Sequence, residues 1–131
     1  MYDELDFEKE LVGKVLREIV GKEGGNEMRF ITVDGEEYLL YHDQDCCETV
    51  EILDICGDLD DLIGSPLLRA EVVSEENSEN PEDVDMEELD EYQESYTWTF
   101  YKLATIKGSV TIRWYGQSNG YYSEEVSFAK V

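Results

Sequence analysis

The sequence predicts an α+β fold, mostly antiparallel β-sheet with a short N-terminal helix and one short internal helix. Three observations predict it. The 131 residues suit a single domain, residues 1–131, and a hydrophobic fraction of 41% is enough to build a core. Several short runs alternate apolar with polar residues, as half-buried strands do. Asp34-Gly35 and Asn119-Gly120 are typical of the tight turns of β-hairpins.

A short helix and a strand are the first two elements. Residues 3–12 begin with clustered acidic side chains, which favour the positive end of a helix dipole, and Gly13 is expected to end the helix. Residues 14–20 fit a helical stripe, but they also form two alternating β-branched faces between Gly13 and Gly21. The flanking glycines favour a strand.

A hairpin is predicted next, with residues 28–33 and 38–42 as its strands and Asp34-Gly35 as its turn. Residues 49–55 alternate apolar with acidic positions and predict a further strand.

The internal helix is predicted at residues 58–64, with Asp58 as its N-cap and Gly64 as its stop. Pro66 then opens a strand over residues 67–73.

Residues 74–94 differ from the rest of the chain. These 21 residues contain 11 acidic side chains and no basic one, and Pro81 lies in their first half. We expect an acidic, flexible loop inserted in the domain, because so charged a segment has little apolar surface to bury.

The last third of the chain is predicted to form a three-stranded antiparallel meander of residues 95–107, 110–115 and 121–131. In its first strand one face carries Tyr96, Trp98 and Phe100, whereas the other carries Thr97, Thr99, Tyr101 and Leu103.

The charge balance excludes several classes of partner. Ten basic residues face 33 acidic ones, which gives a net charge of −23. Binding to nucleic acid requires a basic surface, so we expect no direct contact with nucleic acid, and none with an anionic membrane. The acidic start does not resemble a signal peptide, and no apolar run is long enough for a membrane helix.

Four blocks of the sequence carry a resemblance to known proteins. They are Tyr-His-Asp-Gln-Asp-Cys-Cys-Glu at 41–48 and the segments 57–67, 95–105 and 113–123. In this order they resemble a family of small uncharacterised proteins encoded by bacteriophages and prophages, over most of residues 11–131. The resemblance implies a β-rich single domain of phage origin whose first strand begins with Gly13-Lys14, and it implies no activity. The acidic segment is longer here than the family pattern requires.

The cysteines and the one histidine allow a metal site as an alternative. His42, Cys46, Cys47 and Cys56 match a zinc ligand set in number and type. Their spacing does not, because adjacent cysteines point apart on a strand. The simpler interpretation is a buried cysteine and a histidine hydrogen-bonded near a turn. His42 and Cys46 could also form a catalytic pair across a tight bend, although no oxyanion site is evident.

An odd number of cysteines, two of them adjacent, makes a poor disulfide framework. We therefore expect the reducing cytoplasm of a bacterial host.

Several carboxylates could bind calcium or magnesium. They are Asp43, Asp45, Glu48, Asp54, Asp58, Asp60 and Asp61. The full pattern of a calcium loop is absent, and Asp58 and Asp60 are better explained as the start of a helix. We expect no cofactor and no metal.

The residues expected to bind a partner fall into two sets. Aromatic residues, one arginine and amides near a turn are typical of protein-binding surfaces; this set is Arg113, Tyr115, Tyr121 and Tyr122. The alternative is that Trp114 and one tyrosine fill the core. The acidic set is Glu82, Asp83, Asp85, Glu87, Glu88 and Asp90.

These observations favour a small, non-enzymatic, acidic phage-type inhibitor. It would bind a basic surface of a host protein that handles nucleic acid or acts in defence, such as a restriction or CRISPR factor, with its carboxylates in place of DNA phosphates. The alternative is a small enzyme or a metal- or ligand-binding domain centred on His42, Cys46 and Cys47. A structural phage protein without chemistry is a third hypothesis, and the oligomeric state is not predicted.

Overall fold

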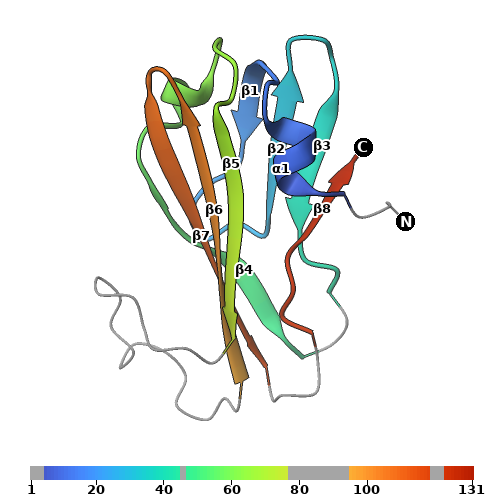
Figure 1. The fold of residues 1–131 in the computed structure, drawn as a ribbon. Helices are drawn as coiled ribbons and strands as arrows, with labels where there is room; N and C mark the ends of the chain where they lie inside the picture. Colours follow the sequence, from blue (N-terminus) through green and yellow to red (C-terminus); the bar gives the residue numbers. More distant parts are fainter. Residues whose placement is uncertain (1–4, 45–46, 77–94, 119–122) are drawn as a thin grey trace.

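Two antiparallel sheets of four strands each form the body of the protein (Figure 1). The computed structural model describes residues 5–44, 47–76, 95–118 and 123–131. The predicted fold class is confirmed, because strands dominate these described residues and their helices are one short α-helix and one 3-10 turn.

The first sheet has the strand order β1-β2-β3-β8. Its members are β1 (Leu16–Val20), β2 (Glu27–Thr32), β3 (Glu37–Tyr41) and β8 (Ser127–Lys130). The β2–β3 hairpin turns at Gly35, whose φ of 88° favours glycine. The predicted strands and turn in this part of the chain are confirmed.

The second sheet has the order β4-β7-β6-β5. Its members are β4 (Thr49–Cys56), β5 (Arg69–Glu76), β6 (Ser95–Thr105) and β7 (Gly108–Ser118). The long β6–β7 hairpin directs Tyr101 and Leu103 from β6, and Ile112 and Trp114 from β7, into the core. The alternative in which Trp114 fills the core is confirmed.

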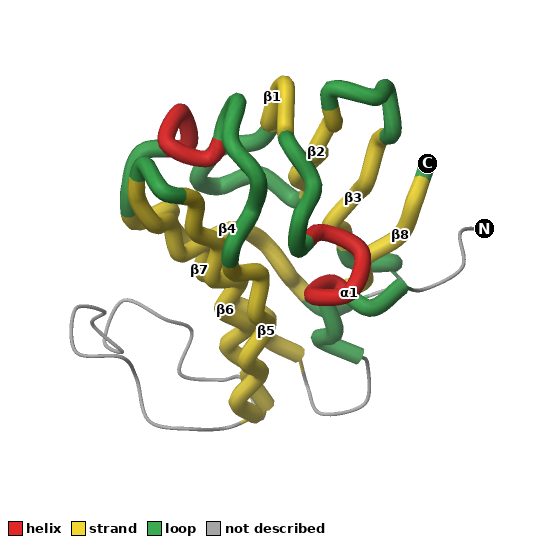
Figure 2. Tube along the Cα trace, turned by 45° about the horizontal axis from the view of Figure 1, so that its top comes forward, coloured by secondary structure: helices red, strands yellow, loops and turns green. Residues whose placement is uncertain are grey.

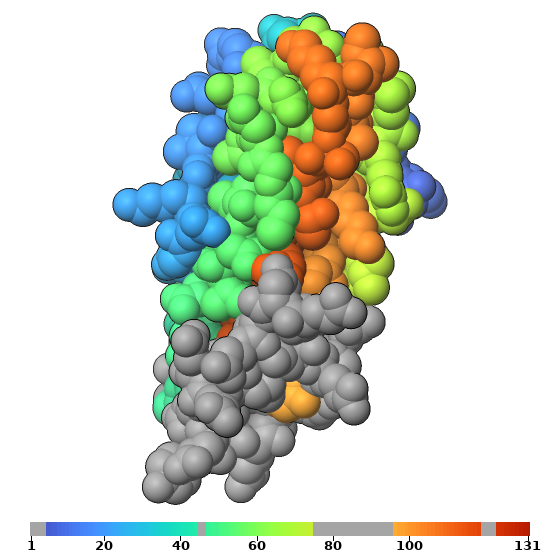
Figure 3. Space-filling model, turned by 90° about the vertical axis from the view of Figure 1, so that its left-hand side faces the viewer, coloured from blue at the N-terminus to red at the C-terminus, as the bar shows by residue number. Residues whose placement is uncertain are grey.

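The outer face of this sheet carries a second group of aromatic side chains. Trp98 lies 4.7 Å from Tyr115 and 6.3 Å from Phe100, measured between ring centroids, and Trp98 and Tyr115 are both buried. Figure 3 looks onto this sheet, with β4 in green beside β7 and β6 in orange.

Helix α1 (Phe7–Leu11) lies at the side of the sandwich between β5 and β8 (Figure 2). Asp6 caps it by accepting a hydrogen bond from the Lys9 backbone N–H, so it begins later than predicted. The Phe7 ring lies 4.8 Å from Tyr101 and 5.0 Å from Phe128, so α1 fastens one sheet to the other.

The internal helix is the 3-10 turn η1 (Leu59–Leu62), with Asp58 as its N-cap as predicted. The predicted N-cap is therefore correct, but the element is a single 3-10 turn, because only four residues adopt helical geometry before Ile63 ends it.

The predicted C-terminal meander is confirmed for its first two strands, which form the β6–β7 hairpin, and is wrong for its third. Strand β8 pairs with β3, with Leu40 opposite Phe128, and therefore belongs to the other sheet. Its apolar residues explain the switch: Phe128 stacks on Tyr38 of β3 at 5.5 Å and fills the space between the sheets.

The predicted boundary of the acidic segment also needs correction, because residues 74–76 belong to β5 and pair with β6. Residues 77–94 and the predicted Asn119-Gly120 turn lie outside the described residues.

Candidate functional site

The described residues of three segments that contain no Lys or Arg meet at one end of the sandwich. Residues 42–49, 74–97 and 117–127 hold sixteen of the 33 acidic residues and none of the ten basic ones. Strand pairing brings them together, with Thr49 opposite Gln117 and Glu76 opposite Thr97. We call this the carboxylate-rich end; it is the lower end in Figure 1.

A buried His–Glu pair lies at the carboxylate-rich end. His42 follows β3, and its Nε2 lies 2.7 Å from Oε2 of Glu48, just before β4. The two side chains are 3% and 0% exposed. Gln44 donates from Nε2 to the other Glu48 oxygen and to the Glu48 backbone carbonyl. The pair therefore ties the end of the first sheet to the start of the second.

The partners of His42 determine where its protons lie. Its Nδ1 is 2.7 Å from the backbone carbonyl oxygen of Glu125, which can only accept, so Nδ1 carries a proton and donates. A proton must also lie between Nε2 and Glu48, because a bare nitrogen lone pair would repel a carboxylate. Both ring nitrogens are engaged, so His42 is a structural link and not a free general base.

A second buried carboxylate, Glu124, lies at the same end. It accepts hydrogen bonds from Thr97 Oγ1 at 2.7 Å and from Ser118 Oγ at 2.5 Å. Gly116 permits this approach, since a Cβ there would lie 3.0 Å from the Glu124 Cβ. The inward face of the second sheet thus changes from apolar in the core to polar at the carboxylate-rich end.

A cavity of about 370 Å³ opens beside the His–Glu pair. Polar side chains line it, namely His42, Asp43, Gln44, Glu48, Ser123, Glu125 and Ser127. Asp43 and Glu125 are exposed, whereas the side chains of His42 and Glu48 are buried. One wall of the cavity is therefore formed by the buried side chains of His42 and Glu48, and the other by the exposed carboxylates of Asp43 and Glu125.

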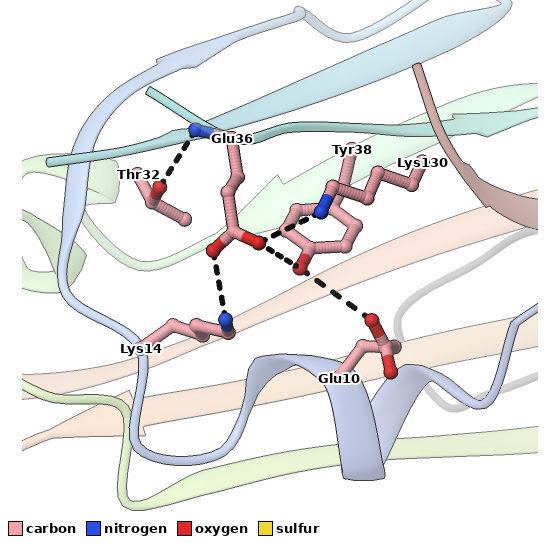
Figure 4. A network of polar contacts seen from close by, with 6 residues as sticks. All are labelled: Glu10, Lys14, Thr32, Glu36, Tyr38 and Lys130. Atoms are coloured by element: carbon pink, nitrogen blue, oxygen red, sulfur yellow. Dashed lines mark hydrogen bonds and ion pairs between the residues drawn. The ribbon is translucent and has the colours of Figure 1, made fainter. Parts of the chain in front are cut away.

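At the opposite end of β3, basic residues are neutralised by carboxylates (Figure 4). Glu36 accepts from Lys14 at 2.7 Å and from Lys130 at 2.8 Å. These hydrogen bonds, that of Lys130 foremost, lower the pKa of Glu36 to about 2. The Tyr38 hydroxyl lies 3.5 Å from both Glu36 and Glu10. This network fastens α1, the β2–β3 hairpin and β8 together.

Arg113 and Tyr115 lie within β7 and not in a turn. Arg113 is buried and makes a bidentate ion pair with Asp54 of β4. Tyr115 is buried against Trp98. Both side chains are buried in the domain, and their role in partner binding stays a prediction.

All of the other predicted partner-binding residues lie outside the described residues: Glu82, Asp83, Asp85, Glu87, Glu88, Asp90, Tyr121 and Tyr122. For the acidic ones, the structure describes only the strand ends at Glu76 and Ser95 that flank their segment, both at the carboxylate-rich end.

The alternative zinc ligands are not brought together in the described part of the chain. Cys56 forms no disulfide and is exposed at the far end of β4 from His42, where its thiol donates to Asp54 Oδ1 at 3.8 Å. Cys47 is disulfide-bonded, contrary to the expectation from the odd cysteine count, and Cys46 lies outside the described residues. No group of three His, Cys, Asp or Glu side chains among the described residues could hold a metal ion.

The sequence did not indicate that Glu48 and Glu124 lie together in one site. Glu48 is in phase with the inward residues Val50 and Ile52, and Glu124 is in phase with Val126 and Phe128. An acidic residue in phase with the apolar, inward-facing residues of a strand indicates a buried carboxylate, and this pattern could have identified both.

Comparison with known proteins gives a family and no activity. Residues 9–128 match the model of a family described as a domain of unknown function (DUF7448). No curated protein and no solved structure matches the chain. None of the described helices is long and apolar enough to cross a membrane.

Proposed function

The chain belongs to the DUF7448 family, a domain of unknown function, and we propose that it is a small acidic interaction protein that binds a basic surface of another protein. The observation that carries this proposal is that three segments, which together hold sixteen acidic and no basic residues, are paired through their described strand ends at one end of the sandwich. Charge of one sign at one end of a rigid domain produces a directed field that attracts a basic partner.

The placement of the basic residues strengthens that field. Lys14, Arg29, Arg69, Arg113 and Lys130 form ion pairs with carboxylates elsewhere on the two sheets. Lys107 is also remote, since it donates to the Ile63 carbonyl beside η1. Among the described residues of the carboxylate-rich end, no carboxylate forms an ion pair with a Lys or Arg.

The partner is a host protein that handles nucleic acid or acts in defence, and the chain inhibits it by occupying its DNA-binding groove. Two arguments support this. A groove that binds DNA is lined with Lys and Arg, so it is complementary to an array of carboxylates. The sequence also resembles proteins of phages and prophages, whose survival depends on blocking such host factors. Inhibition in this way needs no catalytic residue in the chain.

The test uses the whole chain, immobilised and exposed to bacterial lysate, and elution with duplex DNA at constant ionic strength before elution with salt. We expect a specific protein to be released by DNA. Retention of nothing, or only of proteins that DNA does not release, would contradict the proposal.

Two matched variants, each with four charges removed, locate the binding surface. One carries Glu82→Gln, Asp83→Asn, Glu87→Gln and Glu88→Gln. The control carries Glu8→Gln, Glu18→Gln, Asp34→Asn and Asp60→Asn, at exposed positions outside the carboxylate-rich end. We expect loss of the DNA-released protein in the first variant only. Equal loss in both would show that net charge, and not this end, is responsible.

A further inference from the structure

The cavity at the carboxylate-rich end has one wall that the fold holds in place. His42 and Glu48 are buried, and His42 also donates to the backbone carbonyl oxygen of Glu125. These contacts join the segments that precede β4 and β8. The recess is therefore shaped before any ligand arrives, which lowers the entropic cost of binding.

The accessible wall of the cavity carries uncompensated negative charge. Asp43 and Glu125 are exposed and line it, and within the described ranges neither forms an ion pair. Residues 42–49 and 117–127, which supply the lining, contain no Lys or Arg. Because a concave surface concentrates the field of its charges, the cavity favours a cation over a neutral or anionic group.

The chemistry of the lining restricts the kind of cation. A metal ion is not favoured, since no three His, Cys, Asp or Glu side chains of the described segments converge on one point. The lining supplies carboxylates on two segments and the hydroxyls of Ser123 and Ser127. Acceptors spread around a recess suit a planar guanidinium, whose several N–H donors point outward in a fixed fork.

We propose that this cavity binds the guanidinium group of an arginine side chain of the basic partner. The proposal deepens the function proposed above and rests on it for the source of the arginine. A volume of about 370 Å³ accommodates one long side chain but not a folded segment. The surrounding carboxylates bring the partner close, and the cavity fixes its register through one arginine.

The experiment titrates the full chain with arginine blocked at both ends, as its N-acetyl N-methylamide, and follows the backbone amide signals by NMR. We expect saturable shifts of the signals of residues 42–44 and 123–127. The control is the same derivative of citrulline, which keeps the shape of arginine without its charge and should cause no saturable shift. Equal responses to both compounds, or shifts spread over all acidic residues without saturation, would overturn the proposal.

A double variant tests the charged wall. Asp43→Asn with Glu125→Gln removes both exposed carboxylates and leaves the His42 contacts to Glu48 and to the Glu125 carbonyl intact. We expect at least about tenfold weaker binding of blocked arginine. Glu8→Gln with Glu18→Gln removes the same charge elsewhere and should leave binding unchanged. Equal weakening in both double variants would overturn the site.

The outcomes separate this proposal from the proposed function. If the chain does not distinguish blocked arginine from blocked citrulline but still captures a partner that DNA releases, the arginine site in the cavity is contradicted and the proposed function is not. Saturable arginine binding without any captured partner supports the cavity and overturns the function. A saturable response to agmatine, with none to blocked arginine, would assign the cavity to a free amine and overturn the partner's arginine as its ligand.

Discussion

His42 Nε2 lies 2.7 Å from Glu48 Oε2, and both side chains are buried where the two sheets meet at the carboxylate-rich end. The contact joins the residue after β3 to the residue before β4, so it holds the first sheet to the second. It also gives the lone histidine a structural role, since its other nitrogen donates to the Glu125 carbonyl.

Removing the histidine should destabilise the fold. His42→Ala leaves the buried Glu48 without its main partner, and we expect a loss of about 3 kcal/mol in the free energy of unfolding. Glu48→Gln should lose less, because a neutral amide can donate to Nε2 of a neutral imidazole. Denaturant unfolding measures both. An unchanged midpoint for His42→Ala would contradict the buried pair.

Glu36 predicts a pH dependence of stability. Its pKa is lowered from 4.5 to about 2 in the folded protein, chiefly by the hydrogen bond from Lys130. The folded state therefore binds its proton less readily than the unfolded state does. The resulting stability is fully present above about pH 4.5 and is lost as the pH falls towards 2.

The measurement is the unfolding midpoint of the native chain and of Glu36→Gln, taken between pH 6 and pH 2 in steps of about half a pH unit. The difference in unfolding midpoint between the native chain and Glu36→Gln should become smaller as the pH falls. In the Glu36→Gln background, Lys130→Met should have little further effect, because the ion pair is already broken. A difference that stays constant down to pH 2 would contradict the network in Figure 4.

The close approach at Gly116 predicts a local steric cost. A Cβ at this position would lie 3.0 Å from the Glu124 Cβ and 3.1 Å from the Val50 Cγ2. Gly116→Ala should therefore lower the free energy of unfolding by about 1–3 kcal/mol. Thr111→Ala, at a half-buried position on the same strand, should cost less. Equal unfolding midpoints for the two variants would show that the contact is not tight.

The strands follow from the sequence more reliably than their partners do. Alternation of apolar and polar residues identified the strands of both sheets, because it reports which face is buried. It carries no information on which strand lies alongside, so β8 was assigned to the wrong sheet. Tyr115 illustrates the same limit. The predicted strand of residues 110–115 ended before β7 does, so Tyr115 was expected at an exposed tip beside the turn instead of among the outer aromatic residues.

The candidate site was predictable only in part. The excess of carboxylates is visible in the sequence, but the meeting of the strand ends that flank the acidic segments depends on the pairing of β4, β5 and β6 with other strands. The His42–Glu48 contact also depends on how closely the two sheets approach, which no local pattern encodes. The sequence favoured a histidine hydrogen-bonded near a turn and offered cysteines only as alternative partners of His42; its described partners are a carboxylate and a backbone carbonyl.

Arg113 provides a test that separates stability from binding. Its guanidinium forms a bidentate pair with Asp54 on the outer face of the second sheet. Arg113→Lys keeps the charge but loses the second hydrogen bond, so we expect a loss of about 1 kcal/mol in stability. Capture of the DNA-released partner should not change. Loss of capture in a folded Arg113→Lys variant would restore the partner-binding role suggested by the sequence.

The most direct test of the central claim is the salt dependence of partner affinity, measured for the native chain and for the variant with Glu82, Asp83, Glu87 and Glu88 neutralised. If the carboxylate-rich end supplies the attraction, affinity of the native chain falls steeply as salt rises, and the variant binds more weakly with a shallower slope. The control variant with Glu8, Glu18, Asp34 and Asp60 neutralised should keep the native slope. Identical slopes for the native chain and the first variant would contradict the proposed function.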